Sequence, residues 1–121
     1  MSMTVFEVPR EHWVGELDAF TLAHEGWLAS LEVFGAETEP GVRINRLPLI
    51  GVSADRVERD GTIAISVARS GSEHFTHVIH QVRRLYIEVA VDGTTAGLLI
   101  ESSELVRTVV ELRATVSPVR V

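Results

Sequence analysis

A predicted hairpin around Asp92-Gly93 constrains the fold of this chain more than any other feature. Asp-Gly is typical of a two-residue type I′ turn. Apolar residues alternate with other residues on both sides of this dipeptide. A loop of two residues fixes which residues face each other across the hairpin. The expected pairs are Leu85 with Ile100, Ile87 with Leu98, and Val89 with Ala96. All three pairs fall on one face, as a half-buried antiparallel hairpin requires.

A helix is predicted before this hairpin, near the N-terminus. It follows Val8-Pro9-Arg10, where proline suits a first-turn position, and Gly26 is a natural C′ residue after its end. Residues spaced three or four apart give the helix one face to bury. That face consists of Trp13, Leu17, Phe20 and His24.

Several further segments are predicted to form strands because apolar and polar residues alternate in them. These segments are Trp27–Phe34, Val42–Leu47, Thr62–Ala68 and Leu105–Arg113. Pro48 places the end of the second strand at a sheet edge or a bulge, because proline has no N–H to donate. Arg59-Asp60-Gly61 is predicted to form a turn with Gly61 in the left-handed conformation.

The last strand must keep Val106, Thr108, Val110 and Leu112 on the buried face. The loop before it must then hold an odd number of residues, and Ser102-Ser103-Glu104 satisfies this condition. The segment Glu73–Leu85 is ambiguous at this point. Its apolar spacing favours a helix, whereas its β-branched residues favour a strand.

Together these elements predict an α+β domain with one N-terminal helix packed on a bent antiparallel sheet or small open β-barrel of about six or seven strands. A chain of 121 residues can bury a core of its own without disulfides or metal. We expect residues 1–121 to form a single globular domain with an ordered core over about residues 4–116. The tail Ser117–Val121 is expected to fray.

Composition excludes several classes of function. The net charge of −6 argues against nucleic acid and anionic membranes, because both attract clustered positive charge. The absence of cysteine excludes thiol nucleophiles, disulfides and thiolate zinc sites. All eleven basic residues are arginines, which excludes Schiff-base chemistry and a Walker A lysine. The apolar stretches are too short to cross a bilayer and no signal peptide is evident, so we expect a cytoplasmic protein.

Short motifs along the chain carry a resemblance to a known family. These motifs comprise Pro9, Arg10 and Trp13; Phe20, His24, Gly26 and Trp27; Leu47, Pro48, Leu49, Gly51, Ala54 and Asp55; Ile65 and Ser66; His74, Thr76, His77 and Ile79; and Ile100, Glu101 and Ser102. From about Pro9 to Leu112, the chain resembles an uncharacterised bacterial family of small single-domain proteins of unknown function.

The resemblance bears on the ambiguous segment, because relatives often carry prolines just after the position of Ile79. This chain has His80 and Gln81 there instead. Proline at that point would break a helix, so the resemblance implies a strand and then a turn over Phe75–Val82. We follow it against the helical periodicity. The family has no assigned activity, so the resemblance implies none for this chain.

Three histidines form the only cluster that looks like a chemical site: His74, His77 and His80. Imidazole binds zinc, nickel or copper and titrates near neutral pH. On a helix all three would lie along one face, whereas on a strand His77 points away from the other two. Local hydrogen bonding explains these residues as well, and we assign no metal and no cofactor.

Asp55 is a candidate partner for this segment, because a carboxylate often orients an imidazole ring. Its simpler role is in a turn or an ion pair with Arg56. We take His74, His77 and Asp55 as candidate ligand-binding residues and assign no catalytic residue.

We expect the chain to be a small binding or protein-interaction module rather than an enzyme. Its partner would be another protein or a small-molecule ligand, and it would form a homodimer because an edge strand near Pro48 can pair with a second copy. Two alternatives stay open. One is a small hydrolase or isomerase that uses His74, His77 and Asp55, and the other is a metal-binding protein that uses the three clustered histidines. These hypotheses are distinguished by whether His74 and His77 converge with a carboxylate in a partly buried pocket.

Overall fold

One bent antiparallel sheet of eight strands dominates the computed structural model, which describes residues 3–35, 40–55 and 61–115. The strands are β1 (Met3–Glu7), β2 (Leu28–Phe34), β3 (Gly41–Ala54), β4 (Ile63–Ser70), β5 (Glu73–Ile79), β6 (Val82–Ala90), β7 (Thr95–Ser102) and β8 (Val106–Arg113). Their order across the sheet is β1-β6-β7-β8-β2-β3-β4-β5. One α-helix, α1 (Trp13–His24), packs on the sheet, and two short 3₁₀ turns are η1 (Arg10–His12) and η2 (Ser103–Leu105). The predicted α+β class is confirmed, with slightly more strands than expected.

The hairpin of β6 and β7 has the predicted register. Leu85 pairs with Ile100, Ile87 with Leu98, and Val89 with Ala96. The turn type was wrong, because Gly93 has a φ of 76° while Asp92 does not share the positive φ that a type I′ turn requires. The Asp92 carboxylate instead accepts hydrogen bonds from the N–H and hydroxyl of Thr94, which also lowers the pKa of Asp92. The Gly93 N–H closes the turn on the carbonyl of Ala90.

The helix α1 forms where the spacing predicts it. Its buried residues are Trp13, Leu17, Phe20 and His24. Gly26 follows the helix with a φ of 84°, a left-handed conformation that glycine adopts without the strain a Cβ atom brings. The Trp13 indole N–H donates to the carbonyl of Val8 over 2.9 Å, and this bond ties the helix to the end of β1.

Strand β3 continues through Pro48, where the sequence predicted an end. Its first half pairs with β2 and its second half with β4, and Pro48 lies opposite Leu28 in the interior of the sheet. The expected sheet edge at Pro48 is therefore wrong, whereas the alternative expectation of a bulge agrees with the register irregularities on either side of it. The missing N–H is tolerated because β3 changes partners there, between two irregularities in its register. The two edges of the sheet are β1 and β5, so any edge-to-edge contact with a second copy would have to use one of them.

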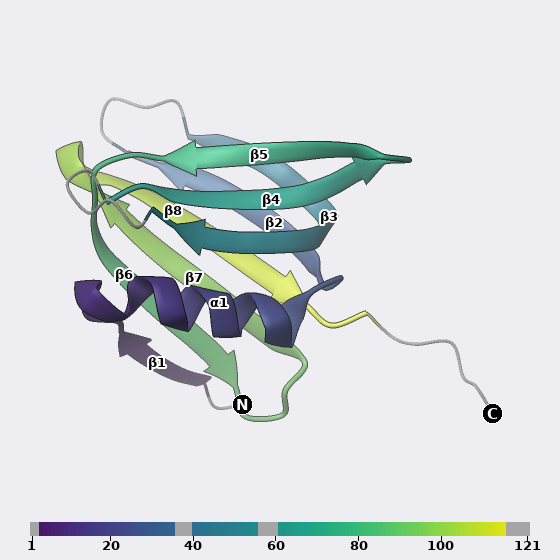
Figure 1. Ribbon diagram of the computed structural model, residues 1–121, viewed down its shortest axis with the longest axis horizontal. Helices are drawn as coiled ribbons and strands as arrows, with labels where there is room; N and C mark the ends of the chain where they lie inside the picture. Colours follow the sequence, from purple (N-terminus) through teal and green to yellow (C-terminus); the bar gives the residue numbers. More distant parts are fainter. Residues whose placement is uncertain (1–2, 36–39, 56–60, 116–121) are drawn as a thin grey trace.

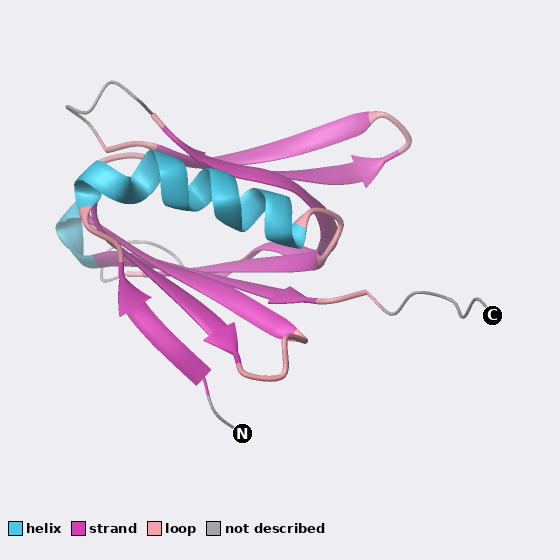
Figure 2. Ribbon diagram, turned by 60° about the horizontal axis from the view of Figure 1, so that its bottom comes forward, coloured by secondary structure: helices cyan, strands magenta, loops and turns pink. Residues whose placement is uncertain are grey.

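The helix fills the gap that this change of partners leaves. The Thr21 hydroxyl donates to the carbonyl of Val52 over 3.0 Å and accepts from the Val52 N–H over 2.9 Å. The side chain thus occupies hydrogen-bonding positions that a neighbouring strand would otherwise take. Figures 1 and 2 show α1 lying between the two halves of the bent sheet, with β3, β4 and β5 on one side and β6 and β7 on the other.

The ambiguous segment is a strand, a turn and a second strand. Strand β5 pairs with β4 from Glu73 to Ile79, and Gln81 makes the turn into β6 with a φ of 56°. The resemblance gave the right structure, and the helical periodicity was misleading. Alternate residues of β5 face the core, so only Phe75, His77 and Ile79 are partly or fully buried.

The loop before β8 has the predicted odd length but starts one residue later, as η2. Ser102 pairs with Val106, so Ile100 faces Thr108 and the residues Thr108, Val110 and Leu112 are buried as predicted. Gly61 has the expected positive φ of 61°, whereas Arg59, Asp60 and the tail Ser117–Val121 lie outside the described residues. Among the residues described, no helix has the length and apolar character needed to span a membrane.

Candidate functional site

The turn between β5 and β6 lies near η2, on the left in Figure 1. A pocket opens where these two turns meet. The Ser103 N–H donates to the carbonyl of Gln81 over 3.0 Å, and the Ser103 hydroxyl donates to the Gln81 side-chain oxygen over 2.7 Å. These bonds join the two turns that form the rim. We call this space the His77 pocket; it has a volume of about 290 Å³ and is lined by Val33, Arg43, His77, Val78, Ile79, His80, Gln81, Ser102, Ser103, Val106 and Thr108.

Thr108 is the most unusual residue of the His77 pocket. It is only 1% exposed and lies on the inner face of β8, between Ile100 of β7 and Val33 of β2. Within the described parts of the chain, no residue makes a hydrogen bond with its hydroxyl group. Buried hydroxyl groups normally have a partner, because desolvation without one is costly. The pocket is therefore the place where a bound molecule could satisfy this hydroxyl.

His77 faces the same pocket from β5. Its ring is half-buried on the inner face of the strand, opposite Ile65 of β4. Burial lowers the pKa of His77, and the positive charge of Arg43 lowers it further. Among the described residues that line the pocket, the ionisable groups are Arg43, His77 and His80.

Only one of the three residues proposed from sequence lines this pocket. His74 is exposed on the opposite face of β5, across from Ala68 of β4. Asp55 directly follows β3, where its N–H donates to the carbonyl of Thr62. The structure thus does not bring His74 and His77 to one cavity. In the described ranges, three or more histidine or carboxylate groups are nowhere arranged to hold a metal ion.

A second hollow, which we call the arginine hollow, lies on the outer face of the sheet beside η2. It has a volume of about 760 Å³ and is lined by Arg83, Arg84, Glu101, Ser102, Leu105, Val106 and Arg107. A register irregularity between Val82 and Arg84 lies at the start of β6. A side-chain hydrogen bond with Tyr86 raises the pKa of Arg84, with further contributions from Glu7 and Glu101.

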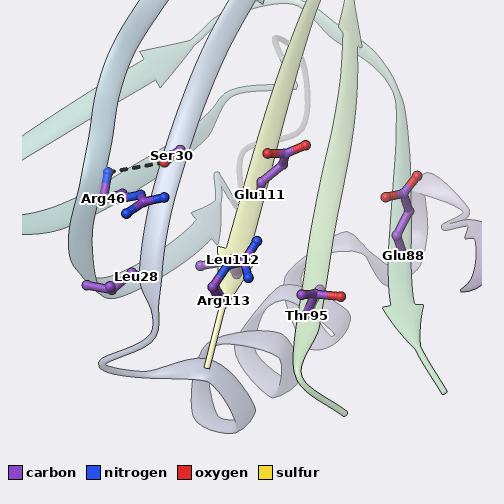
Figure 3. Close-up of a pocket in the computed structure, with 9 residues that line it drawn as sticks. Leu28, Ser30, Arg46, Glu88, Thr95, Glu111, Leu112 and Arg113 are labelled. Carbon is purple, nitrogen blue, oxygen red and sulfur yellow. Dashed lines mark hydrogen bonds between the residues drawn. The ribbon is translucent and has the colours of Figure 1, made fainter. Parts of the chain in front are cut away.

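A third hollow, shown in Figure 3, lies farther along the same outer face. It has a volume of about 300 Å³, and its charged residues are Arg46, Glu88, Glu111 and Arg113. The backbone N–H of Arg46 donates to the Ser30 hydroxyl over 3.1 Å, drawn as a dashed line. Two arginines and two glutamates share this surface, so it has no excess of either charge.

The sequence pointed to His77 but missed the two other residues that give the His77 pocket its character. Arg43 comes from β3 and Thr108 from β8, far from His77 along the chain. One signal was present: Thr108 is the only polar residue on the predicted buried face of the last strand. A polar residue at such a position either finds a partner in the core or faces a cavity.

The fold and pocket define a small α+β domain with a partly polar cavity between the two halves of a bent sheet. The chain matches a family of unknown function (DUF5335) over residues 5–119, and it belongs to that family. The resemblance found in its motifs is thereby confirmed. No curated protein and no solved structure matches the chain.

Proposed function

We propose that this chain is a small binding module, without catalytic activity, that holds a short-chain monocarboxylate in the His77 pocket. The observation that supports this most is the buried Thr108 hydroxyl, which has no hydrogen-bond partner among the described residues. Thr108 lines the same cavity as His77. A hydroxyl donor beside an imidazole that can be protonated matches the needs of a single carboxylate.

The apolar part of the pocket supports a ligand with a short aliphatic chain. Val33, Ile79 and Val106 contribute apolar surface to the same cavity. A carboxylate oxygen would accept from Thr108 and from a protonated His77, while the aliphatic carbons contact the three apolar side chains. Pockets that combine apolar walls with a few converging polar groups are typical of small-molecule sites.

Binding rather than catalysis is favoured by the surroundings of His77. A catalytic histidine usually has a carboxylate or carbonyl group that fixes its ring, and the described lining of this pocket contains no carboxylate. The hydrolase or isomerase alternative requires His74 and Asp55 beside His77. His74 projects from the opposite face of β5, and Asp55 is not among the residues that line the pocket.

The proposal implies a pH dependence with a definite sign. Among the described residues, the titratable groups that line the pocket with His77 are Arg43 of β3 and His80 of the adjoining turn, and Ile65 of β4 pairs with His77. Burial and Arg43 lower the pKa of His77 in the free protein, so the ring is mostly neutral at pH 7. A bound carboxylate stabilises the protonated ring. Affinity should therefore increase as the pH falls from 8 to 6.

Butyrate is the probe that tests this proposal. We expect it to shift the backbone NMR signals of β5 and β8 with a Kd of about 1 mM, as befits a ligand with so few atoms. Thr108→Val should weaken binding at least fivefold, and His77→Gln should remove its pH dependence. His74→Gln is the matched control, because this histidine lies on the other face of the same strand, and it should leave Kd within twofold.

Two results would overturn the proposal. One is the absence of any saturable shift with butyrate at pH 6. The other is equal weakening by His74→Gln and His77→Gln, which would indicate an effect on the whole of β5 instead of a contact in the pocket.

A further inference from the structure

The residues of the arginine hollow support a second binding site, beyond the proposed function. The hollow lies on the outer face of the sheet, and of the described residues only Ser102 and Val106 line both it and the His77 pocket. We propose that this hollow is a separate binding site for the phosphate group of a small phosphate monoester. The placement of its arginines, its net charge and its size support this assignment.

A local departure from regular strand geometry places two neighbouring arginines beside one hollow. In a regular strand, successive side chains point to opposite faces, so Arg83 and Arg84 would diverge. Here the pairing of β6 with β7 shifts between Val82 and Arg84, and both arginines line the hollow. An irregularity of this kind re-aims side chains and is common beside functional sites.

The third arginine approaches from β8. Glu101 of β7 pairs with Arg84 on one side and with Arg107 on the other, so the three side chains lie in one row across the sheet. Among the described residues that line the hollow, three guanidinium groups and one carboxylate leave a formal excess of two positive charges. A phosphate monoester carries about −1.5 to −2 charges at pH 7 and has three acceptor oxygens. Its charge therefore matches that of the hollow, although the chain as a whole is acidic.

The hollow also has room and apolar surface for the organic part of such a ligand. Its volume of about 760 Å³ is the largest of the three hollows described above. Leu105 lines it while being 80% exposed, and its φ of 61° is uncommon for leucine. A large apolar side chain held exposed in this conformation can contact the carbon skeleton of a bound ester.

Guanidinium groups suit phosphate because they donate paired hydrogen bonds in a plane. Phosphate presents its oxygens in a tetrahedron, so the two arginines of β6 and the one of β8 can each reach a different oxygen. A dicarboxylate of equal charge carries two planar groups that cannot meet three guanidinium groups in this way. Succinate is therefore a control that tests shape at constant charge.

Calorimetric titration with glucose 6-phosphate at constant ionic strength tests the inference. We expect a Kd on the order of 0.1 mM. Glucose should not bind, inorganic phosphate should bind more weakly than the ester, and succinate should bind at least tenfold more weakly. Arg84→Gln and Arg107→Gln should each weaken binding at least tenfold. Arg113→Gln removes the same charge from the same strand as Arg107 but outside this hollow, and it should leave Kd within twofold.

The pH dependence and two cross-controls separate this site from the His77 pocket. Binding of glucose 6-phosphate should strengthen between pH 5 and pH 7, because the second phosphate ionisation lies at a pKa of about 6. Butyrate should show the opposite trend. Thr108→Val should leave the binding of glucose 6-phosphate unchanged, and Arg84→Gln should leave that of butyrate unchanged. Equal affinity for succinate, or equal loss in the Arg113 and Arg107 variants, would overturn the inference.

Discussion

Replacing Thr108 by valine should make the folded protein more stable while weakening its binding of butyrate. Valine has nearly the shape of threonine but no hydroxyl, so the substitution removes a polar group and leaves β8 otherwise unchanged. Thr108 is 1% exposed, and its hydroxyl has no hydrogen-bond partner in the described chain. Burying a hydroxyl in this way costs about 1–3 kcal/mol in proteins. We expect a gain of about 1 kcal/mol, at the lower end, because Thr108 lines an open cavity.

Urea unfolding followed by circular dichroism measures this gain. In a domain of this size, about 1 kcal/mol corresponds to a rise in Tm of roughly 4 °C. The matched control is Val110→Thr, on the same face of β8, where the native side chain is 1% exposed. That substitution buries a new hydroxyl and should lower stability by about 1–3 kcal/mol. A loss of stability in Thr108→Val would refute the reasoning, because it would mean that the hydroxyl already has a partner inside the protein.

Three further predictions concern the sheet and the histidine segment. Ile87→Asp should abolish cooperative unfolding because Ile87 is 3% exposed, whereas Glu88→Lys on the other face should change stability by less than about 0.5 kcal/mol. Gly97→Ala should cost about 1–3 kcal/mol in urea unfolding, because the new Cβ atom would lie 2.9 Å from the backbone oxygen of Val110; an unchanged midpoint would mean that the strands separate easily at Gly97. Zinc should leave Tm unchanged in a thermal-shift assay, and a stoichiometric rise that disappears in His74→Ala would favour the metal-binding alternative.

Alternation along the chain was sufficient to predict most of the sheet. The pairs Ile87–Leu98 and Leu85–Ile100 follow from a turn position and a period of two, both of which are local properties of the sequence. The same is true of the helix, whose buried residues repeat every three or four positions. Segments of this kind carry their own register, so no knowledge of distant contacts is needed.

The errors arose where distant parts of the chain decide the structure. The local sequence at Pro48 predicts the end of a strand. Strand β3 nevertheless continues, because β2 pairs with its first half and β4 with its second half. Thr21 of α1 also makes hydrogen bonds with the backbone of Val52. The spacing of apolar residues in β5 and β6 imitates a helix because a turn at Gln81 interrupts the alternation. In both cases tertiary contacts override the local pattern.

The candidate site was less predictable than the fold for the same reason. Only His77 of the proposed residues lines the pocket, and its partners Arg43 and Thr108 come from strands that the bend of the sheet brings near β5. Local spacing contains no information about that bend. In the sequence, the cavity was indicated by Thr108, the polar residue on the predicted buried face of the last strand.

Titration of the His77 ring by NMR, with and without saturating butyrate, tests the central claim most directly. Without ligand, burial and Arg43 should hold the pKa of His77 below its ordinary value of 6.5. With butyrate bound, the carboxylate should raise the pKa of His77. A pKa of His77 that stays the same at saturating butyrate would contradict the claim that this pocket binds a carboxylate through its imidazole ring.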